Sequence, residues 1–411
     1  MAYGDVKGNF KKKEYMKKVL VYHKMLTSLL GGGTFQPLML IAELQKCSDV
    51  TLALNGDTDM EQVTKMSGVP IDVSRLKVVR LDPPEGFLTR HEYLLGLYRM
   101  RKLKALARDA DICISTANVM DFGKPGHHFI YLLSQFGGHA FYDYLMQMHI
   151  RSKTGVRRIL RRICTGIGEN IVKPLWGLRP QRQIMADPLE HIYPTSRYVE
   201  GILRGYYGQF NSTVFYPPTI FEFTATDVPR DPLLAIYIGR IFPPKRITDI
   251  IAVVERAREL SGKDLKLQIA GMLMEIPYTE LLKKMAAERP WLQLVGAKYG
   301  EEKEKFMLSA TYALHAERDE AFGIAIAEYL KAGNVPIVPD EGGPKEIVDD
   351  SELTFKTNEE AAQTLAKLLN DEAFRAEKQR HCAERAKEFT LGAYMERQRK
   401  VLADIVQDDA H

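Results

Sequence analysis

Residues 320–346 combine two carboxylates with two glycine-rich helix starts, a combination suited to a phosphate-bearing ligand. Glu320 comes just before a segment of helical composition, residues 322–332, and Glu328 lies two turns further along that segment. We expect Glu320 to project from the loop into the ligand site, and Glu328 to face the mouth of the same site from the helix. Gly333 stands where many helices end in a left-handed residue. The pattern predicts a loop carrying one carboxylate, then a helix carrying a second.

The backbone at both helix starts could hold an anion. The first helix would present the amides of Phe322, Gly323 and Ile324. Such amides have no partner within a helix and lie at the positive end of its dipole, so they favour a ligand such as a diphosphate. Gly342 and Gly343 let a second backbone approach closely, and Pro344 suits the first position of a new helix. Two helix starts at one sheet edge predict a phosphate site.

Arg240 and Lys245 supply positive charge in the loop after a predicted strand, residues 234–240. This loop would lie at the carboxyl edge of a sheet, where α/β proteins bind their ligands. Arginine offers forked hydrogen bonds to a diphosphate, and lysine offers a point charge. The alternative is that both are surface cations without a ligand.

The rest of the chain predicts an α/β fold, with short apolar strands that alternate with helices. In the first half, strands are predicted at residues 19–22, 50–54, 76–81, 111–115 and 129–134, with another beginning at His191. In the second half, they are predicted at residues 234–240, 265–270, 292–295, 313–315 and 335–338. Residues 217–232 are turn-rich and predict a linker between two domains.

The order of these motifs resembles retaining glycosyltransferases of the GT-B fold, in the large family 4 (glycosyl transferases group 1). The resemblance rests on an E-x7-E pattern joined to Phe-Gly-Ile, Ala-Gly and Gly-Gly-Pro, and it is densest over residues 236–348. The passage from Leu314 to Val338 is especially similar to lipid-linked-oligosaccharide mannosyltransferases. The resemblance implies two Rossmann-like, doubly wound domains that face each other across a cleft. Residues 1–216 would bind the acceptor, residues 217–390 the nucleotide sugar, and residues 391–411 would form a helix packing back on the first domain.

The resemblance also implies roles for single residues. Glu328 would bind the nucleotide ribose, and Glu320 would face the sugar, hold its hydroxyls and stabilise positive charge; a carboxylate that only stabilises the helix start is the alternative for Glu320. Arg240 and Lys245, with the helix amides, would act as catalytic groups on the departing diphosphate without a metal. Arg246 stands where the family has glycine, so the backbone there would be less free.

Three features of the first half of the chain are candidates for contact with the donor or the acceptor, and alternatives without a ligand stay open. Gly32 and Gly33 would face the donor diphosphate and the acceptor, or form a tight turn without a ligand. Gln135 stands where family members often place a histidine near the transferred sugar. His128 is a second candidate on the sugar and acceptor side, although solvated histidines are the alternative for the His127-His128 pair, which has no carboxylate or thiol spaced to complete a metal site.

A basic amphipathic segment follows. Its cationic face carries Arg157, Arg158, Arg161 and Arg162. This face favours contact with an anionic membrane surface or with a pyrophosphate-linked acceptor, and a solvated helix face is the alternative. No aromatic platform accompanies the arginines, which argues against nucleic acid.

Composition sets the broad class of the protein. The chain has 411 residues, 45% hydrophobic and 27% charged, with a net charge of +4, as in soluble globular proteins of two domains. Four scattered cysteines resemble reduced thiols of a cytosolic protein. No run approaches the ~18–20 apolar residues of a spanning helix. Asp57-Thr-Asp59 has a metal-binding form but follows turn residues, so we expect no metal. We expect a cytoplasmic protein, with peripheral contact to the inner membrane face left open.

The sequence thus predicts a metal-independent retaining hexosyltransferase. It would move a hexose, with mannose favoured, from a GDP- or UDP-sugar to a hydroxyl of a lipid-linked or polysaccharide acceptor. The nucleotide sugar would be a co-substrate, and no bound cofactor is expected. The alternatives are a soluble enzyme acting on a small metabolite, a phosphorylase of the same fold with a pyridoxal cofactor, and an inactive sugar-nucleotide-binding scaffold.

Overall fold

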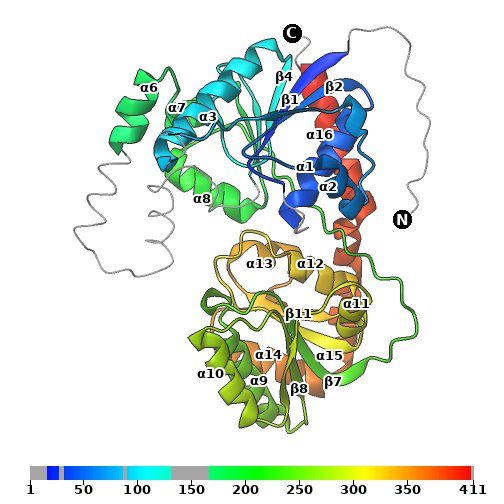
Figure 1. Cartoon of the computed structure of the whole chain (residues 1–411). Helices are drawn as coiled ribbons and strands as arrows, with labels where there is room; N and C mark the ends of the chain where they lie inside the picture. Colours follow the sequence, from blue (N-terminus) through cyan, green and yellow to red (C-terminus); the bar gives the residue numbers. More distant parts are fainter. Residues whose placement is uncertain (1–15, 27–31, 87–89, 131–165, 409–411) are drawn as a thin grey trace.

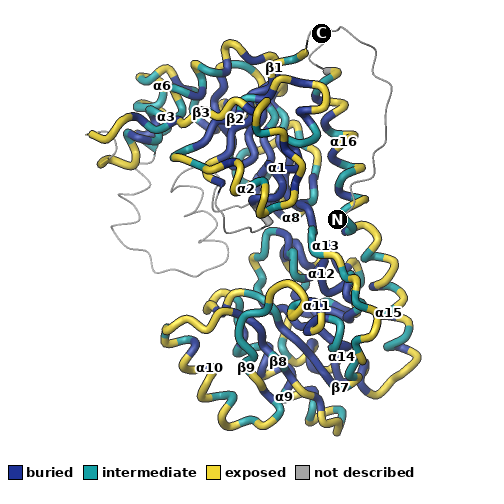
Figure 2. Tube along the Cα trace, turned by 45° about the vertical axis from the view of Figure 1, so that its right-hand side comes forward, coloured by how far each residue is buried: buried dark blue, intermediate teal, exposed yellow. Residues whose placement is uncertain are grey.

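Two six-stranded parallel sheets form the cores of two α/β domains that lie one above the other (Figure 1). The computed structural model describes residues 16–26, 32–86, 90–130 and 166–408. Parallel strands are joined by helices that cover both faces of a sheet, so the strands are buried and rich in apolar residues. Figure 2 shows this burial along the strands of both sheets.

The first sheet has the strand order β3-β2-β1-β4-β5-β6. Its strands are β1 (Lys17–His23), β2 (Ser48–Leu54), β3 (Lys77–Arg80), β4 (Ile112–Ser115), β5 (His127–Ile130) and β6 (His191–Pro194). Its helices are α1 (Gly32–Leu44), α2 (Met60–Ser67), α3 (Glu92–Leu106), α6 (Lys173–Leu175), α7 (Gln181–Ala186) and α8 (Arg197–Tyr207). The side chain of Ser196 accepts a hydrogen bond from the amide of Val199 and so caps α8.

The second sheet has the order β12-β11-β10-β7-β8-β9. Its strands are β7 (Asp231–Ile238), β8 (Lys266–Ala270), β9 (Leu292–Gly296), β10 (Ala310–Leu314), β11 (Val335–Pro339) and β12 (Thr354–Phe355). The helices here are α9 (Ile247–Ser261), α10 (Pro277–Ala287), α11 (Gly300–Leu308), α12 (Ile324–Lys331), α13 (Gly342–Val348), α14 (Asn358–Asn370) and α15 (Glu372–Ala386). In both sheets the strand order reverses beside the first strand, which is the point where doubly wound folds bind ligands.

The last helix, α16 (Leu391–Asp408), returns to the first domain (Figure 1). Tyr394, Leu402 and Ile405 are buried in the core that α1 forms with the first sheet. The side-chain amide of Gln398 donates a hydrogen bond of 2.9 Å to the carbonyl oxygen of Met39. The expected crossing of the final helix is therefore confirmed. The chain passes between the domains through residues 213–230, which contain no helix or strand.

Several predicted bounds differ from the structure for local reasons. Helix α12 begins at Ile324 and not at Phe322, because Gly323 has a φ of 98°, in the left-handed region that stops a helix. Helix α13 already begins at Gly342, so Pro344 is its third residue. Gly32 and Gly33 lie in the first turn of α1 and not in a loop before it. Strand β12 was not predicted. In the described part of the chain, no helix is both long enough and apolar enough to cross a membrane.

Candidate active site

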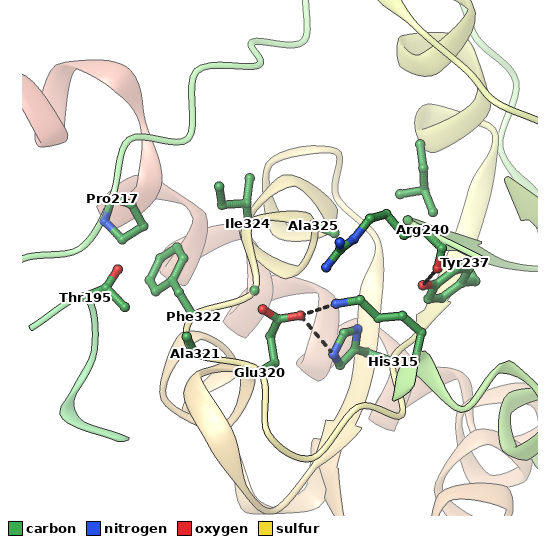
Figure 3. A pocket seen from close by; sticks show the side chains of 14 residues that line it. Thr195, Pro217, Tyr237, Arg240, His315, Glu320, Ala321, Phe322, Ile324 and Ala325 are labelled. Atoms are coloured by element: carbon green, nitrogen blue, oxygen red, sulfur yellow. Dashed lines mark hydrogen bonds and ion pairs between the residues drawn. The ribbon is translucent and has the colours of Figure 1, made fainter. Parts of the chain in front are cut away.

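A pocket of about 210 Å³ lies at the carboxyl ends of β7 and β10, where the strand order of the second sheet reverses. Residues from both domains line it: Thr195, Pro217, Tyr237, Ile238, Gly239, Arg240, Lys245, His315, Glu320 and 321–325. The predicted groups Arg240, Lys245 and Glu320 are thus brought together. Figure 3 shows Arg240 and Glu320 on the same side of the pocket. They converge because the carboxyl ends of neighbouring parallel strands meet at one sheet edge.

The two glycine-rich loops pack against each other and fix one wall of this pocket. The amide of Gly343 donates a hydrogen bond of 2.9 Å to the carbonyl oxygen of Glu320. A Cβ atom at Gly343 would come within 2.5 Å of the Cα atom of Phe322, so only glycine allows this approach. Gly342 and Gly343 do not themselves line the pocket. They support the loop that does.

The start of α12 faces the pocket through Phe322, Gly323, Ile324 and Ala325. The first amides of a helix have no partner within it and carry partial positive charge. This wall of the pocket is therefore suited to an anion.

Lys245 bridges two carboxylates in the pocket. Its Nζ atom donates a hydrogen bond of 2.5 Å to Oε2 of Glu320 and another to Oε2 of Glu317. Burial alone would lower the pKa of Lys245, but the two carboxylates raise it above its ordinary value. Burial would raise the pKa of Glu320, but Lys245 and the neighbouring Glu317 and His315 together lower it to about 2. Glu320 is therefore ionised at neutral pH and cannot act as an acid.

The pKa shifts of Glu317 and His315 favour their neutral forms, whereas the pKa shifts of Glu320 and Lys245 favour their charged forms. Burial, followed by the hydrogen bond to Glu320 and its charge, raises the pKa of Glu317 to about 7. Burial lowers the pKa of His315 to about 4, so its ring is neutral. Nε2 of His315 is buried without a hydrogen-bond partner among the described residues and lies 4.0 Å from Oε2 of Glu320. His315, Glu317 and Glu320 each bring a possible metal-ligand atom within 4.8 Å of one another, and Nζ of Lys245 contacts both carboxylates.

Arg240 differs from Lys245 in being exposed. Within the described residues, no acidic side chain pairs with its guanidinium, which points toward the same space as Glu320 (Figure 3). The hydroxyl of Tyr237 donates a hydrogen bond of 3.1 Å to the carbonyl oxygen of Arg240 and so holds the backbone of this loop. Arg246, which replaces the expected glycine, adopts a φ of 51°, a left-handed conformation unfavourable for arginine.

Glu328 is buried and does not line the pocket. Its carboxylate forms an ion pair of 2.7 Å with Nζ of Lys303 on α11. The expectation that Glu328 faces the same mouth as Glu320 is therefore wrong for this structure. The ion pair with Lys303 on α11 holds the side chain of Glu328 away from the pocket.

His128 also lies away from the pocket. It is fully buried, and its Nδ1 atom accepts a hydrogen bond of 3.4 Å from the amide of Met120. Nε2 lies 2.8 Å from Oε2 of Glu190, and Arg179 pairs with the other oxygen of that carboxylate at 2.6 Å. Both ring nitrogens are occupied, so the structure places no sugar contact at His128.

The remaining predicted residues are placed as follows. Gly32 and Gly33 are the first two residues of α1. Five others lie outside the described residues: Gln135, Arg157, Arg158, Arg161 and Arg162.

Three residues at the pocket were missed by the sequence reasoning. His315 and Glu317 follow β10 directly, and their closeness to Glu320 along the chain was the available signal. Thr195 follows β6 in the first domain, and its buried hydroxyl oxygen has no hydrogen-bond partner in the part of the chain that the structure describes. A polar group at the end of a strand was the signal there.

Comparison with known proteins assigns the second domain. Residues 220–389 match the model of the family Glycosyl transferases group 1. The match covers most of the second domain and does not extend into the first. No curated protein matches the chain.

Solved structures match both domains at once. Sucrose-phosphate synthase from Thermosynechococcus elongatus has a TM-score of 0.64 and 12% identity, with 95% of this chain and 99% of that chain covered. HepE of Anabaena in complex with UDP has a TM-score of 0.63 and 12% identity, over 95% and 100% of the two chains. WaaG, a glycosyltransferase involved in lipopolysaccharide biosynthesis, has a TM-score of 0.61 and 12% identity, over 95% and 99%. At such identities the likeness establishes the GT-B fold. The match of residues 220–389 to the group 1 family supports a glycosyltransferase.

Proposed function

We propose that this glycosyltransferase binds the diphosphate of a nucleotide sugar in the pocket between β7 and β10. The observation that carries the proposal is that Arg240, Lys245 and the start of α12 line one pocket together with Glu320. Two cations and free helix amides provide the donors and positive charge that a diphosphate requires. Two structural neighbours support the ligand class, because HepE was solved with UDP-glucose and a pneumococcal O-GlcNAc transferase with UDP and GlcNAc.

The reaction we propose is retaining transfer of a hexose to a hydroxyl without a metal. The bond between the anomeric carbon and the diphosphate oxygen breaks, and the acceptor oxygen bonds to the same face of that carbon. The proton of the acceptor hydroxyl passes to the departing diphosphate. Arg240, Lys245 and the helix amides stabilise the negative charge that develops there. Because Glu320 is ionised, its role is to hold sugar hydroxyls and stabilise the positive charge of the sugar.

Further parts of the proposal rest on the sequence resemblance. Mannose as the sugar, a GDP- or UDP-linked donor, and a lipid-linked or polysaccharide acceptor belong here, as does contact of the basic residues 157–162 with an anionic membrane surface from the cytoplasm. Glu328 can bind the ribose only if its ion pair with Lys303 rearranges, because the carboxylate is buried in this structure. Thr195 brings a hydroxyl from the first domain to the pocket, on the side proposed for the acceptor.

Thermal unfolding with a panel of UDP-, GDP-, ADP- and dTDP-sugars tests the donor site. A donor at about 100 times its dissociation constant should add about 2.7 kcal/mol of stability. Arg240→Ala should abolish the shift, whereas Arg101→Ala, an exposed position on α3 outside the pocket, should leave it unchanged. If no nucleotide sugar stabilises the protein, the donor site is wrong. Stabilisation without any transfer or slow hydrolysis of the donor would favour the inactive scaffold.

A further inference from the structure

The pocket region contains one carboxylate more than the proposed reaction uses. Glu317 contacts the ammonium of Lys245 from the loop after β10, although Glu320 already provides that lysine with a counter-ion. Lys245 is largely buried between them, with 14% of its side chain exposed. The lysine expected to bind the diphosphate is therefore held by two competing acceptors.

We propose that Glu317 is a positioning residue that holds Lys245 before a donor binds and takes up one proton when the donor diphosphate draws Lys245 away. The inference rests on the proposed donor site, and it adds a property of that site: binding of the nucleotide sugar is coupled to uptake of a proton.

The charges around Glu317 favour uptake of a proton when a donor binds. Before a donor binds, the ammonium of Lys245 is shared by the carboxylates of Glu317 and Glu320, and a bound diphosphate would compete with them for it. Once Lys245 turns to the diphosphate, the two carboxylates lose the cation between them. Two carboxylates in contact cannot both remain ionised at ordinary cost, and a proton shared between them relieves the repulsion.

Among the groups that face this site, Glu317 is the one suited to take the proton. The pKa of Glu317 is raised to about 7, first by burial and then by Glu320. Glu320 has a pKa lowered to about 2 despite its burial, and burial keeps the ring of His315 neutral by lowering its pKa to about 4. Tyr237 beneath them has a pKa raised well above its ordinary value by burial, so it stays neutral.

The coupling predicts how affinity depends on pH. Below about pH 6 Glu317 is already protonated, and the dissociation constant of the donor should not change with pH. Above about pH 7.5 each bound donor requires nearly one proton, so the dissociation constant should rise about tenfold for each pH unit. The diphosphate of an intact nucleotide sugar carries no phosphate monoester, so the donor itself does not titrate near pH 6 as a free nucleoside diphosphate does.

Isothermal titration calorimetry of the full chain measures this proton directly. UDP-glucose and GDP-mannose are titrated at pH 8 in HEPES and in Tris, whose ionisation enthalpies differ, and the difference in observed enthalpy gives the number of protons taken up. We expect nearly one proton for the wild type. Glu317→Gln keeps a hydrogen-bond donor toward Glu320 and should take up none, and its dissociation constant for the donor should vary by less than about twofold from pH 6 to pH 9.

A matched control separates Glu317 from the other carboxylate that titrates in this range. Burial raises the pKa of Glu346 to about 7, and its oxygens accept hydrogen bonds of 3.0 and 3.1 Å from the amide of Arg197 at the contact between α13 and α8. Glu346→Gln should leave the proton uptake unchanged. If it removes the uptake and Glu317→Gln does not, the proton is taken up at the domain contact and the proposal for Glu317 is overturned.

The remaining outcomes separate this inference from the donor site itself. Failure of both nucleotide sugars to bind the wild type overturns the donor site and the inference together. Binding without proton uptake at pH 8 leaves the donor site standing and overturns the role of Glu317. This second result needs only the wild-type protein, so the inference stays testable even if Glu317→Gln does not fold.

Discussion

Replacing Gly343 with alanine tests whether the two glycine-rich loops must pack backbone to backbone. The new Cβ atom would lie 2.5 Å from the Cα atom of Phe322 and 2.6 Å from the carbonyl oxygens of both Ala321 and Phe322. Non-bonded heavy atoms prefer about 3.5–4.0 Å, so the loops must separate by about 1 Å. Overpacking costs about 1–3 kcal/mol, and we expect the upper end because all three obstructing atoms belong to the backbone and cannot rotate away.

Urea unfolding measures this cost as a fall in the midpoint at unchanged slope. Because residues 321–323 line the pocket, donor binding should weaken as well. Gly201→Ala is the control: Gly201 lies within α8, a Cβ atom there would have no neighbour within 4 Å, and the variant should gain up to about 1 kcal/mol from the helix propensity of alanine. If Gly343→Ala is within about 0.5 kcal/mol of the wild type, as surface substitutions usually are, and binds donor equally well, the packing argument is refuted.

Three further substitutions test the charges. Arg240→Ala should slow donor turnover about 10²–10³-fold, measured as nucleotide release, as loss of one donor to a developing charge does; the free energy of unfolding should not change, because Arg240 is exposed, and a large loss of stability would contradict this. Lys245→Met leaves Glu317 and Glu320 without their shared cation, so the free energy of unfolding at pH 8 should be up to about 3–5 kcal/mol lower than in the wild type. The loss should be smaller at pH 5, where a proton relieves the repulsion between the two carboxylates. Equal losses at both pH values would contradict this explanation. Burial raises the pKa of Glu346 from 4.5 to about 7, so its stabilising contribution is complete below about pH 4.5 and is lost as the pH rises through 7. Glu346→Gln should therefore gain stability relative to the wild type between pH 5 and pH 8. An unchanged difference in the free energy of unfolding between the two proteins over this range would contradict this.

The sequence was sufficient for the parts of the site that depend on strand order. Arg240, Lys245 and Glu320 follow the strands β7 and β10, and neighbouring parallel strands bring such loops to one edge whatever the side chains between them. The start of α12 was located to within two residues for the same reason. Its first residue was missed because helical composition continues through Gly323, whose left-handed backbone ends the pattern.

The sequence was insufficient where a distant ion pair decides the position of a side chain. Glu328 has the spacing of a pocket residue, but Lys303 on a neighbouring helix holds its carboxylate elsewhere. His128 is enclosed by Glu190, which is 62 residues away in the chain. Glu317 gained significance only once the structure placed Lys245 against it. Such contacts depend on side-chain packing between elements, which periodicity and composition do not encode.

The pocket between β7 and β10 is the site that we propose for the donor diphosphate. The most direct measurement is a crystal structure of the protein with the nucleotide sugar that stabilises it most. We predict that the diphosphate contacts the guanidinium of Arg240, the ammonium of Lys245 and the backbone amides at the start of α12. A diphosphate bound elsewhere, with Lys245 still bridging Glu317 and Glu320, would show that this pocket is not the donor site.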